Sequence, residues 1–402
     1  MESYEFLLFL AIILISTKAL GLFSRYIHMP TVVGALLAGV ILGPSFLNVI
    51  GIEGSTGVFL EQMAEIGVVL LMFNAGLGTE IEEMKKNLVA SLVTAIVGVI
   101  VPLIGGFLGY AFWFHTDFAN YTEVLQSVFV GVVLTATSVS ITVETLREMG
   151  KLKGKVGTTI LGAAVLDDII GIIVLTIVIS LKDTSVSPTS VILKIVLYFI
   201  LIAIIAFVAF KLERFIDVAD RKRRTVILAI AFCFILSYVS EQFFGIADIT
   251  GAYFAGLMLC SFKVGPYIAR RCDIVSYAIF SPIFFASVGL KVTLGGMTVS
   301  VWLFSLVLLI IAILTKVVGC GLGARFCGCN NKEAFQIGIG MVSRGEVALI
   351  VAQKGYACGL LDKVLFAPIV IVVIITTLLT PILLKIFMND TEALEGAANN
   401  IC

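Results

Sequence analysis

Long apolar stretches separated by short polar ones run along the whole chain. Leu88 to Phe114 and Val364 to Leu384 contain no charged residue. Each is long enough to cross a lipid bilayer, which takes about 20 residues of α-helix. The strands of a membrane barrel would instead be short and would alternate polar with apolar residues. The pattern therefore predicts an all-α polytopic membrane protein.

We expect about thirteen transmembrane helices, because the apolar pattern can be divided into that many segments. The segments run over 4–24, 31–49, 57–77, 88–114, 123–146, 155–181, 188–210, 224–243, 246–262, 269–290, 297–324, 333–353 and 364–387. The opening MESYEF carries acidic residues and no basic cluster. Met1 to Arg25 is therefore interpreted as the first span rather than as a cleaved signal peptide.

The composition supports a membrane protein and excludes several other classes. The chain has 402 residues, of which 60% are hydrophobic and 13% are charged, whereas a soluble domain is about 25% charged. Its eight cysteines lie mostly in or beside apolar runs, which favours buried free thiols over a disulfide framework. With only two histidines, no metal centre is expected. Enzymatic activity, a cofactor and a nucleic-acid partner are not expected either.

The basic residues predict how the chain is oriented in the membrane. The loops after even-numbered segments hold only Lys182, Lys291, Lys354 and Lys363, whereas the loops after odd-numbered segments hold several times as many basic residues. Arg221 to Arg224, the sequence RKRR, is part of the second group and is interpreted as a topology signal. Basic loops stay in the cytoplasm. We therefore expect a multi-pass protein of the plasma membrane with its N-terminus outside and its C-terminus inside.

Two short sequences recur in the same order. VVGALLAGVILGP (Val32 to Pro44) resembles ITGAYFAGLMLCS (Ile249 to Ser261), and FNAGL (Phe73 to Leu77) resembles ASVGL (Ala286 to Leu290). The offset of seven spans is odd, so the two copies would cross the membrane in opposite senses. Inverted-topology repeats are typical of secondary transporters, whose binding site lies near the bilayer midplane. The alternative is that small residues at these positions only allow close helix packing.

Two segments contain residues that weaken a continuous helix. LTATSVS (Leu134 to Ser140) offers hydroxyls that compete for backbone hydrogen bonds, and GIGMVSRGEVAL (Gly338 to Leu349) combines glycines with two charges. A broken helix exposes N–H and C=O groups that can hold an ion or a substrate. The alternative is that Ser and Thr bond back to their own turn. The break residues singled out here are Thr135, Ser343, Arg344 and Glu346.

Asp167 and Asp168 are adjacent in the apolar run AAVLDDIIGIIV. A charge at the centre of a membrane helix costs about 2.5–3.5 kcal/mol on insertion scales, so such residues are candidates for function. Neighbouring helical residues point about 100° apart, so one acid can pair with another helix while the other faces a cavity. Lys316 is the basic residue at comparable depth. A carboxylate in such a cavity can hold either a proton or a small cation, and that competition produces exchange. The alternative is a structural polar cluster.

The sequences TATSVS, LGAAVLDDIIG, TKVVG and SRGEVALI occur in this order between Pro30 and Leu384. This combination resembles the monovalent cation:proton antiporters, which include bacterial sodium/proton antiporters and potassium-efflux antiporters. The resemblance implies two inverted repeats and two broken, crossing helices in a core domain packed on a dimerisation domain. The ranges expected from it are 1–87 (dimerisation helices 1–3), 88–182 (core helices 4–6), 183–223 (linking helix 7 and a basic loop), 224–292 (dimerisation helices 8–10), 293–388 (core helices 11–13) and 389–402 (a short cytoplasmic tail).

The resemblance also implies roles for individual residues. Asp168 would bind the cation (Na⁺) or the proton, Thr137 and Ser138 would line that site, and Asp167 would pair with Lys316. Paired aspartates favour electrogenic Na⁺/H⁺ exchange by a homodimer. Two alternatives stay open. One is a K⁺/H⁺ antiporter of the same family, with Li⁺ as a further candidate ion. The other is a sodium-coupled symporter of organic anions, which would not need a titrating carboxylate at its ion site.

Overall fold

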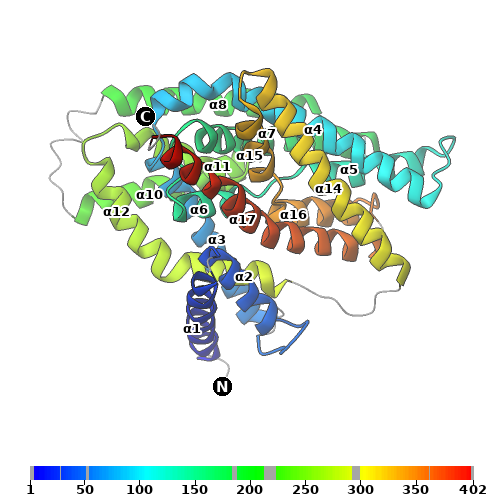
Figure 1. Cartoon of the computed structure of the whole chain (residues 1–402), viewed down its shortest axis with the longest axis horizontal. Helices are drawn as coiled ribbons and strands as arrows, with labels where there is room; N and C mark the ends of the chain where they lie inside the picture. The colour runs from blue at the N-terminus through cyan, green and yellow to red at the C-terminus, as the bar shows by residue number, and fades with distance from the viewer. Residues whose placement is uncertain are drawn as a thin grey trace. The chain divides into compact units, whose positions relative to one another are not determined.

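A computed structural model describes residues 4–27, 29–50, 54–182, 188–211, 223–291, 299–361 and 363–399, and within them the chain contains helices and no strands (Figure 1). The helices are α1 (Glu5–Tyr26), α2 (Thr31–Leu42), α3 (Gly54–Leu77), α4 (Ile81–Phe114), α5 (Tyr121–Thr135), α6 (Val139–Glu148), α7 (Lys155–Lys182), α8 (Pro188–Lys211), α10 (Arg223–Val239), η1 (Ser240–Phe244), α11 (Asp248–Cys260), α12 (Gly265–Val275), η2 (Ser276–Phe280), α13 (Ser281–Leu290), α14 (Val299–Phe326), α15 (Asn331–Gly340), α16 (Gly345–Ala357) and α17 (Lys363–Asn399).

The length and apolar character of these helices suit a membrane. Among the described residues, 10 helical stretches are long and apolar enough to span one, and α2 and α11 are shorter apolar helices. The expectation of a helical, multi-pass membrane protein is thereby confirmed. The count of thirteen spans stays a prediction. Two helix ends differ from the ends of the apolar segments: α2 ends at Leu42 rather than near 49, and α17 continues to Asn399 rather than ending near 387.

Local sequence explains where several helices begin and change pitch. The side chain of Asn120 accepts a hydrogen bond from the Thr122 N–H at the start of α5. Asn330 and Glu333 form a reciprocal capping box at the start of α15, which satisfies two N–H groups that the first helical turn leaves without partners. The π-helical turn η2 ends two residues before Pro282, a residue that removes one backbone donor.

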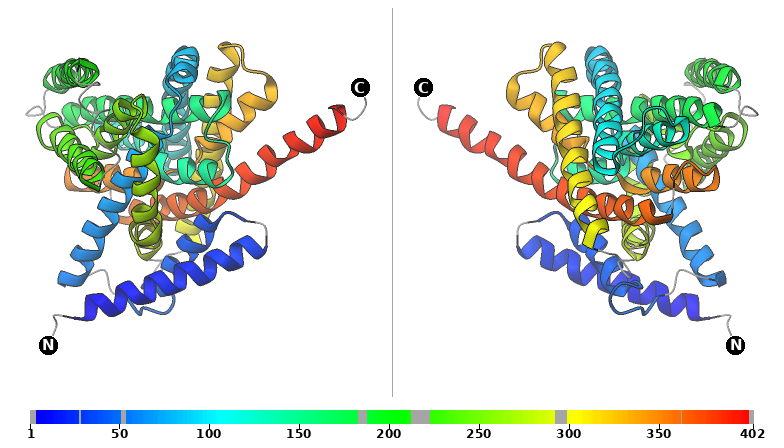
Figure 2. Two further views of the ribbon diagram at one scale, coloured as in Figure 1. Left: turned by 90° about the vertical axis from the view of Figure 1, so that its left-hand side faces the viewer. Right: turned by 90° about the vertical axis from the view of Figure 1, so that its right-hand side faces the viewer.

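The chain divides into two compact units. Unit 1 comprises residues 1–17, 38–86 and 172–291, and unit 2 comprises residues 18–37, 87–171 and 292–402. In unit 2 the long helix α17 contains Pro368 and Pro381 and forms one continuous coil that leads toward the C-terminus (Figure 2). Unit 2 also contains both predicted break sequences and both aspartates, so the candidate site is described within it. The assignment of the helices to a core and a dimerisation layer stays a prediction.

Two close helix contacts in unit 1 involve positions that align in the sequence repeat. A Cβ atom on Gly39 of α2 would collide with the backbone carbonyl of Ala286 on α13. A Cβ atom on Gly256 of α11 would collide with the carbonyl of Phe73 on α3. The repeat aligns Gly39 with Gly256 and Phe73 with Ala286. The aligned glycines therefore touch the aligned carbonyls.

A second pair of aligned positions behaves in the same way. Gly34 of α2 lies against the carbonyl of Leu20 on α1, and its aligned partner Gly251 of α11 lies against the carbonyl of Leu236 on α10. In both cases a Cβ atom would clash with backbone, which cannot move aside as the end of a side chain can. Only glycine allows these helices to approach so closely.

Candidate ion-binding site

Both predicted break sequences interrupt a helix in unit 2. The first helix stops at Thr135 and resumes at Val139, and the residues between them are extended rather than helical. The second stops at Gly340 and resumes at Gly345. Each break leaves carbonyl groups at the end of one half-helix without their usual intrahelical partners. In a membrane these groups have no water to bond with, so protein groups or an ion must satisfy them.

The two breaks lie against each other and satisfy part of each other's backbone. The N–H of Ser138 donates to the carbonyl of Ser343 at 2.7 Å. The hydroxyl of Thr142 donates to the carbonyl of Gly340, the last residue of α15, at 2.8 Å. Groups from one half of unit 2 thus replace the hydrogen bonds that the break in the other half removes.

Arg344 connects the first break to α14. Its guanidinium donates from Nη1 to the carbonyl of Ala136 at 3.0 Å and from Nη2 to the carbonyl of Ala312 at 2.7 Å. The side chain is completely buried. The C-terminal end of α5 carries a partial negative charge, which a cation stabilises. Arg344 therefore holds the first break and α14 at a fixed separation.

Gly345 is the residue at which the second break turns into α16. Its φ of +54° lies in the left-handed region, which residues with a Cβ atom rarely adopt. A Cβ atom would also collide with the side chain of Ser138. Both the conformation and the space at this position require glycine.

Asp167 and Lys316 form a buried ion pair. The ammonium Nζ of Lys316 on α14 donates to the two carboxylate oxygens of Asp167 on α7, at 3.1 and 3.2 Å. Lys316 is fully buried and Asp167 is 2% exposed. Gly98 of α4 lies beside this pair, where a Cβ atom would collide with the sulfur of Cys320 on α14. Desolvating two charges is costly, and only good geometry and mutual attraction offset that cost.

The Asp167 carboxylate also connects the ion pair to the breaks. It interacts electrostatically with the guanidinium of Arg344 and with the hydroxyl of Thr137, which stands between the two halves of the first broken helix. The pair and the breaks therefore form one polar cluster inside unit 2.

Asp168 follows Asp167 on the same uninterrupted helix. It is 7% exposed, and both of its carboxylate oxygens are shielded from solvent. Helical geometry turns its side chain about 100° away from that of Asp167. Ala163 and Ala164, one turn earlier, are small and buried. The ammonium of Lys316 thus bonds to the first carboxylate of the pair, while the second points in another direction.

The remaining predicted residues fall into three groups. The hydroxyl of Thr135 donates to the carbonyl of Val132 in its own turn at 2.7 Å. This is the bonding expected from the sequence as the alternative to a role in holding an ion. Ser138 and Ser343 lie at the contact between the breaks and are buried. Glu346 lies in α16, and its side chain is outside the described part of the chain.

Sequence reasoning missed three groups that hold the cluster together. These are the hydroxyl of Thr142 and the carbonyls of Ala136 and Ala312. Thr142 lies one turn after a predicted break, and this position could have indicated it. The two carbonyls carry no sequence signal, because every residue has the same backbone carbonyl group.

The polar cluster combines two acidic and two basic side chains. Among the described residues, no three side chains of the His, Cys, Asp and Glu types are grouped as a metal centre would require. With Asp167, Asp168, Lys316 and Arg344 all ionised, the four charges of the cluster sum to zero. Adding either a proton or a monovalent cation at a carboxylate changes that sum by the same amount.

Comparisons with known proteins agree on a family. A family model described as "Sodium/hydrogen exchanger, transmembrane" matches residues 8–390. The chain is 41% identical over 384 residues to the "Na(+)/H(+)-K(+) antiporter GerN" of Bacillus cereus, covering 95% of this chain and 96% of that protein. It is 36% identical over 395 residues to the "Na(+)/H(+) antiporter" of Enterococcus hirae, covering 97% and 100%.

A solved structure shares the fold. The sodium proton antiporter MjNhaP1 of Methanocaldococcus jannaschii at pH 8 superimposes with a TM-score of 0.69 at 18% sequence identity, covering 96% of this chain and 98% of that one. The match to the family model and the similarity to two relatives over nearly their whole length lead to the same result. The chain belongs to the sodium/hydrogen exchanger family of transmembrane proteins.

Proposed function

We propose that the chain is a secondary-active antiporter that exchanges a monovalent cation for protons, with cation and proton competing for Asp168. The observation that carries this proposal is the unequal environment of two adjacent buried carboxylates. The ammonium of Lys316 bonds to both oxygens of Asp167, whereas Asp168 points elsewhere on the same helix. Buried acids inside a membrane protein are expensive and mark ion or proton pathways.

The charges of the cluster explain why binding of the two ions is exclusive. Either one proton or one monovalent cation neutralises the Asp168 carboxylate, whereas both together would leave an uncompensated positive charge at that carboxylate. Such a charge is costly in a dry interior. Net exchange follows when the loaded site is exposed alternately to the two sides of the membrane.

Asp167 and Lys316 would act as the coupling pair. If Lys316 gives up its ammonium proton when the cation binds on one side of the membrane and regains a proton on the other side, more than one proton moves for each cation. The transport would then be electrogenic, as the resemblance of the paired aspartates implies. The bonds of 3.1 and 3.2 Å support this role, because a change at either partner must alter the other.

Sodium is the cation we favour. Carboxylate, hydroxyl and carbonyl oxygens are hard ligands that suit Na⁺ and Li⁺, and the relative from Enterococcus hirae is named as a Na⁺/H⁺ antiporter. Potassium is the second candidate, since the name of GerN from Bacillus cereus includes K⁺. Membership in the exchanger family leaves the organic-anion symporter without support.

The inverted repeat is also proposed on structural grounds. Two pairs of glycines aligned by the repeat touch backbone carbonyls in equivalent ways, namely Gly39 with Gly256 and Gly34 with Gly251. The two halves of unit 2 show the same relation. Gly131, shortly before the first break, lies against the carbonyl of Leu103, and Gly338, shortly before the second, lies against that of Val317. Chance packing of small residues does not predict matched carbonyl partners.

The wider architecture of the proposal follows the family. We propose thirteen spans, crossing of the two broken helices, a dimerisation layer that joins two copies of the chain, and a plasma-membrane location with the N-terminus outside. The proximity of the two breaks supports the crossing. The apolar length of the helices supports a location in a membrane, and the distribution of basic residues between the loops supports the orientation.

The test is transport by the purified protein in proteoliposomes that contain a pH-sensitive dye. Addition of Na⁺ should move protons in the wild type, and Asp168→Asn should remove this flux because the asparagine cannot carry a proton. Asp168→Glu is the matched control and should keep part of the flux. Normal flux in Asp168→Asn would contradict the proposal. Separate additions of Na⁺, K⁺ and Li⁺ to the wild type establish which cation is transported.

A further inference from the structure

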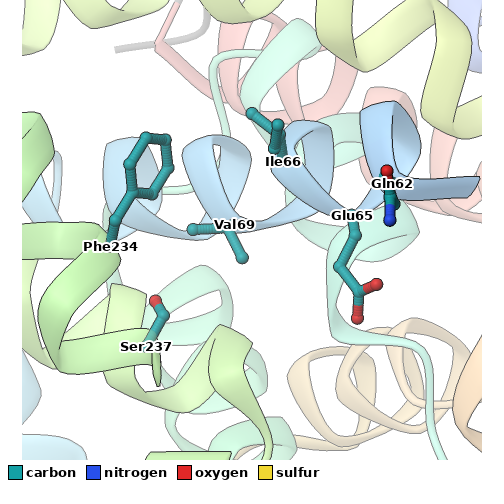
Figure 3. Close-up of a pocket in the computed structure, with 6 residues that line it drawn as sticks. All are labelled: Gln62, Glu65, Ile66, Val69, Phe234 and Ser237. Carbon is teal, nitrogen blue, oxygen red and sulfur yellow. The ribbon is translucent and has the colours of Figure 1, made fainter. Parts of the chain in front are cut away.

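Unit 1 contains a hollow that is separate from the polar cluster of unit 2. Its volume is about 350 Å³, and it lies between α3 and α10. Figure 3 shows the lining side chains, which are Gln62, Glu65, Ile66, Val69, Phe234 and Ser237. We call this hollow the α3–α10 groove. The residues from α3 recur at spacings of three and four, so they lie along one face of that helix.

The groove has a polar end and an apolar body. Gln62 and Glu65 place an amide and a carboxylate on the first turn of the lining face, and Ile66, Val69 and Phe234 follow with apolar surface. From Gln62 to Val69 the helix rises about 10 Å at 1.5 Å per residue. A ligand that fits this groove therefore has a polar head joined to an apolar part.

The charge around Glu65 selects a cationic head. The charged groups that act on its carboxylate are Glu61, Glu241 and Lys291. Lys291 already bonds to Glu61 at 2.7 Å, and these two charges largely cancel. Glu65 and Glu241 then leave the polar end negative, which attracts a positive group and repels an anion.

The number of oxygen ligands argues against a bare metal cation. The groove offers the carboxylate of Glu65, the amide oxygen of Gln62 and the hydroxyl of Ser237. Ser237 is 5% exposed and lies among apolar groups, with the Cys233 thiol as a weak hydrogen-bonding neighbour. Three oxygens spread along a hollow of this volume cannot surround Na⁺ or Mg²⁺. An ammonium group instead needs only two or three acceptors on one side.

We propose that the α3–α10 groove binds an amphiphilic primary ammonium ion. Its ammonium donates to Glu65 and Gln62, and its apolar part lies along Ile66 and Val69 against the ring of Phe234. This site goes beyond the proposed antiport function, because it involves none of the residues of the polar cluster. Two sources have this chemistry: a soluble alkylamine, and the ethanolamine headgroup of a membrane lipid.

The probe is hexylammonium, titrated against the full chain in phosphatidylcholine nanodiscs and followed by saturation-transfer difference NMR, with empty nanodiscs as the reference. The wild type should bind it saturably, and Glu65→Gln should weaken binding at least tenfold. Hexanol, which has the same chain without the charge, should bind much more weakly. Glu82→Gln is the matched control, because it makes the same change at a carboxylate that does not line the groove, and it should stay within about threefold of the wild type.

Asp168→Asn separates this site from the ion site. Hexylammonium binding that survives Asp168→Asn and is lost in Glu65→Gln supports the groove. Binding that is lost in Asp168→Asn and kept in Glu65→Gln overturns it, as does the absence of saturable binding. A Phe234→Ala variant should weaken hexylammonium more than methylammonium, and equal losses for the two amines would also overturn the assignment. Replacing phosphatidylcholine with phosphatidylethanolamine in the nanodiscs distinguishes the two sources. If the groove binds the lipid headgroup, phosphatidylethanolamine should compete with hexylammonium and weaken its binding. If the groove binds only soluble amines, hexylammonium binding should be the same in both lipids.

Discussion

Replacing Lys316 with methionine tests whether the buried ion pair holds unit 2 together. Methionine has a similar length and no charge, so the variant removes the ammonium without opening a large cavity. The Asp167 carboxylate then loses the partner at 3.1 and 3.2 Å while it stays 2% exposed. Breaking a buried pair in this way costs about 3–5 kcal/mol, because one charge is left without compensation. Asp167→Asn should cost a comparable amount, since it leaves the buried ammonium of Lys316 without its carboxylate partner.

The double variant, Lys316→Met with Asp167→Asn, should be more stable than either single variant because neither position then holds a buried charge that has lost its partner. Because the double variant should lose less stability than either single variant, the coupling free energy between the two positions should be at least the cost of one single variant, about 3–5 kcal/mol. Thermal unfolding in detergent can be followed by intrinsic fluorescence, because both tryptophans of the chain, Trp113 and Trp302, lie in unit 2. Lys86→Met is the control, since Lys86 pairs with Glu83 at the surface. It should leave the transition unchanged. Additive losses from the two single variants would refute the argument.

Three further predictions concern the backbone contacts and Arg344. Gly39→Val and Gly256→Val should destabilise unit 1 to a similar degree, because both add atoms where a backbone carbonyl already lies. Gly171 is a helical glycine with no neighbour within 4 Å, so Gly171→Ala should be neutral or stabilising by up to about 1 kcal/mol. Equal shifts in the unfolding temperature for all three glycine variants would contradict the close helix contacts at Gly39 and Gly256. Arg344→Lys should slow proton flux in proteoliposomes although it keeps the charge, because one ammonium cannot bridge the two carbonyls as the planar guanidinium does. Unchanged flux would show that the bridge is dispensable. Gly345→Ala should reduce both the stability and the flux of the purified protein, since its φ is +54° and a Cβ atom there would meet Ser138. A variant with wild-type unfolding and transport would exclude strain at this turn.

Much of the candidate site could be predicted because intramembrane charges are rare and costly. Asp167, Asp168 and Lys316 are conspicuous in apolar surroundings, and the 100° offset between neighbouring helical residues already assigned them different directions. The bond between Asp167 and Lys316 agrees with that expectation. The two break sequences could be located because hydroxyls, glycines and charges all weaken a helix.

The partners within the breaks could not be predicted. The guanidinium of Arg344 bonds to backbone carbonyls of Ala136 and Ala312, and backbone groups give no sequence signal of their tertiary position. Thr135 and Thr137 look equivalent in the sequence, yet the hydroxyl of Thr135 bonds back to its own turn, whereas that of Thr137 acts electrostatically on the Asp167 carboxylate. Helix ends were also hard to predict where the apolar pattern continues beyond the helix, as at Leu42 of α2.

Proton release on cation binding tests the central claim most directly. Na⁺ is added to the purified protein in weakly buffered detergent solution, and a pH dye reports the protons that leave. If cation and proton compete for Asp168, the wild type should release protons in proportion to the Na⁺ bound. Its apparent Kd for Na⁺ should rise by up to about tenfold for each unit that the pH falls while a proton occupies the site. Asp168→Asn should release none. Na⁺ binding without proton release in the wild type, or undiminished release in Asp168→Asn, would contradict the account.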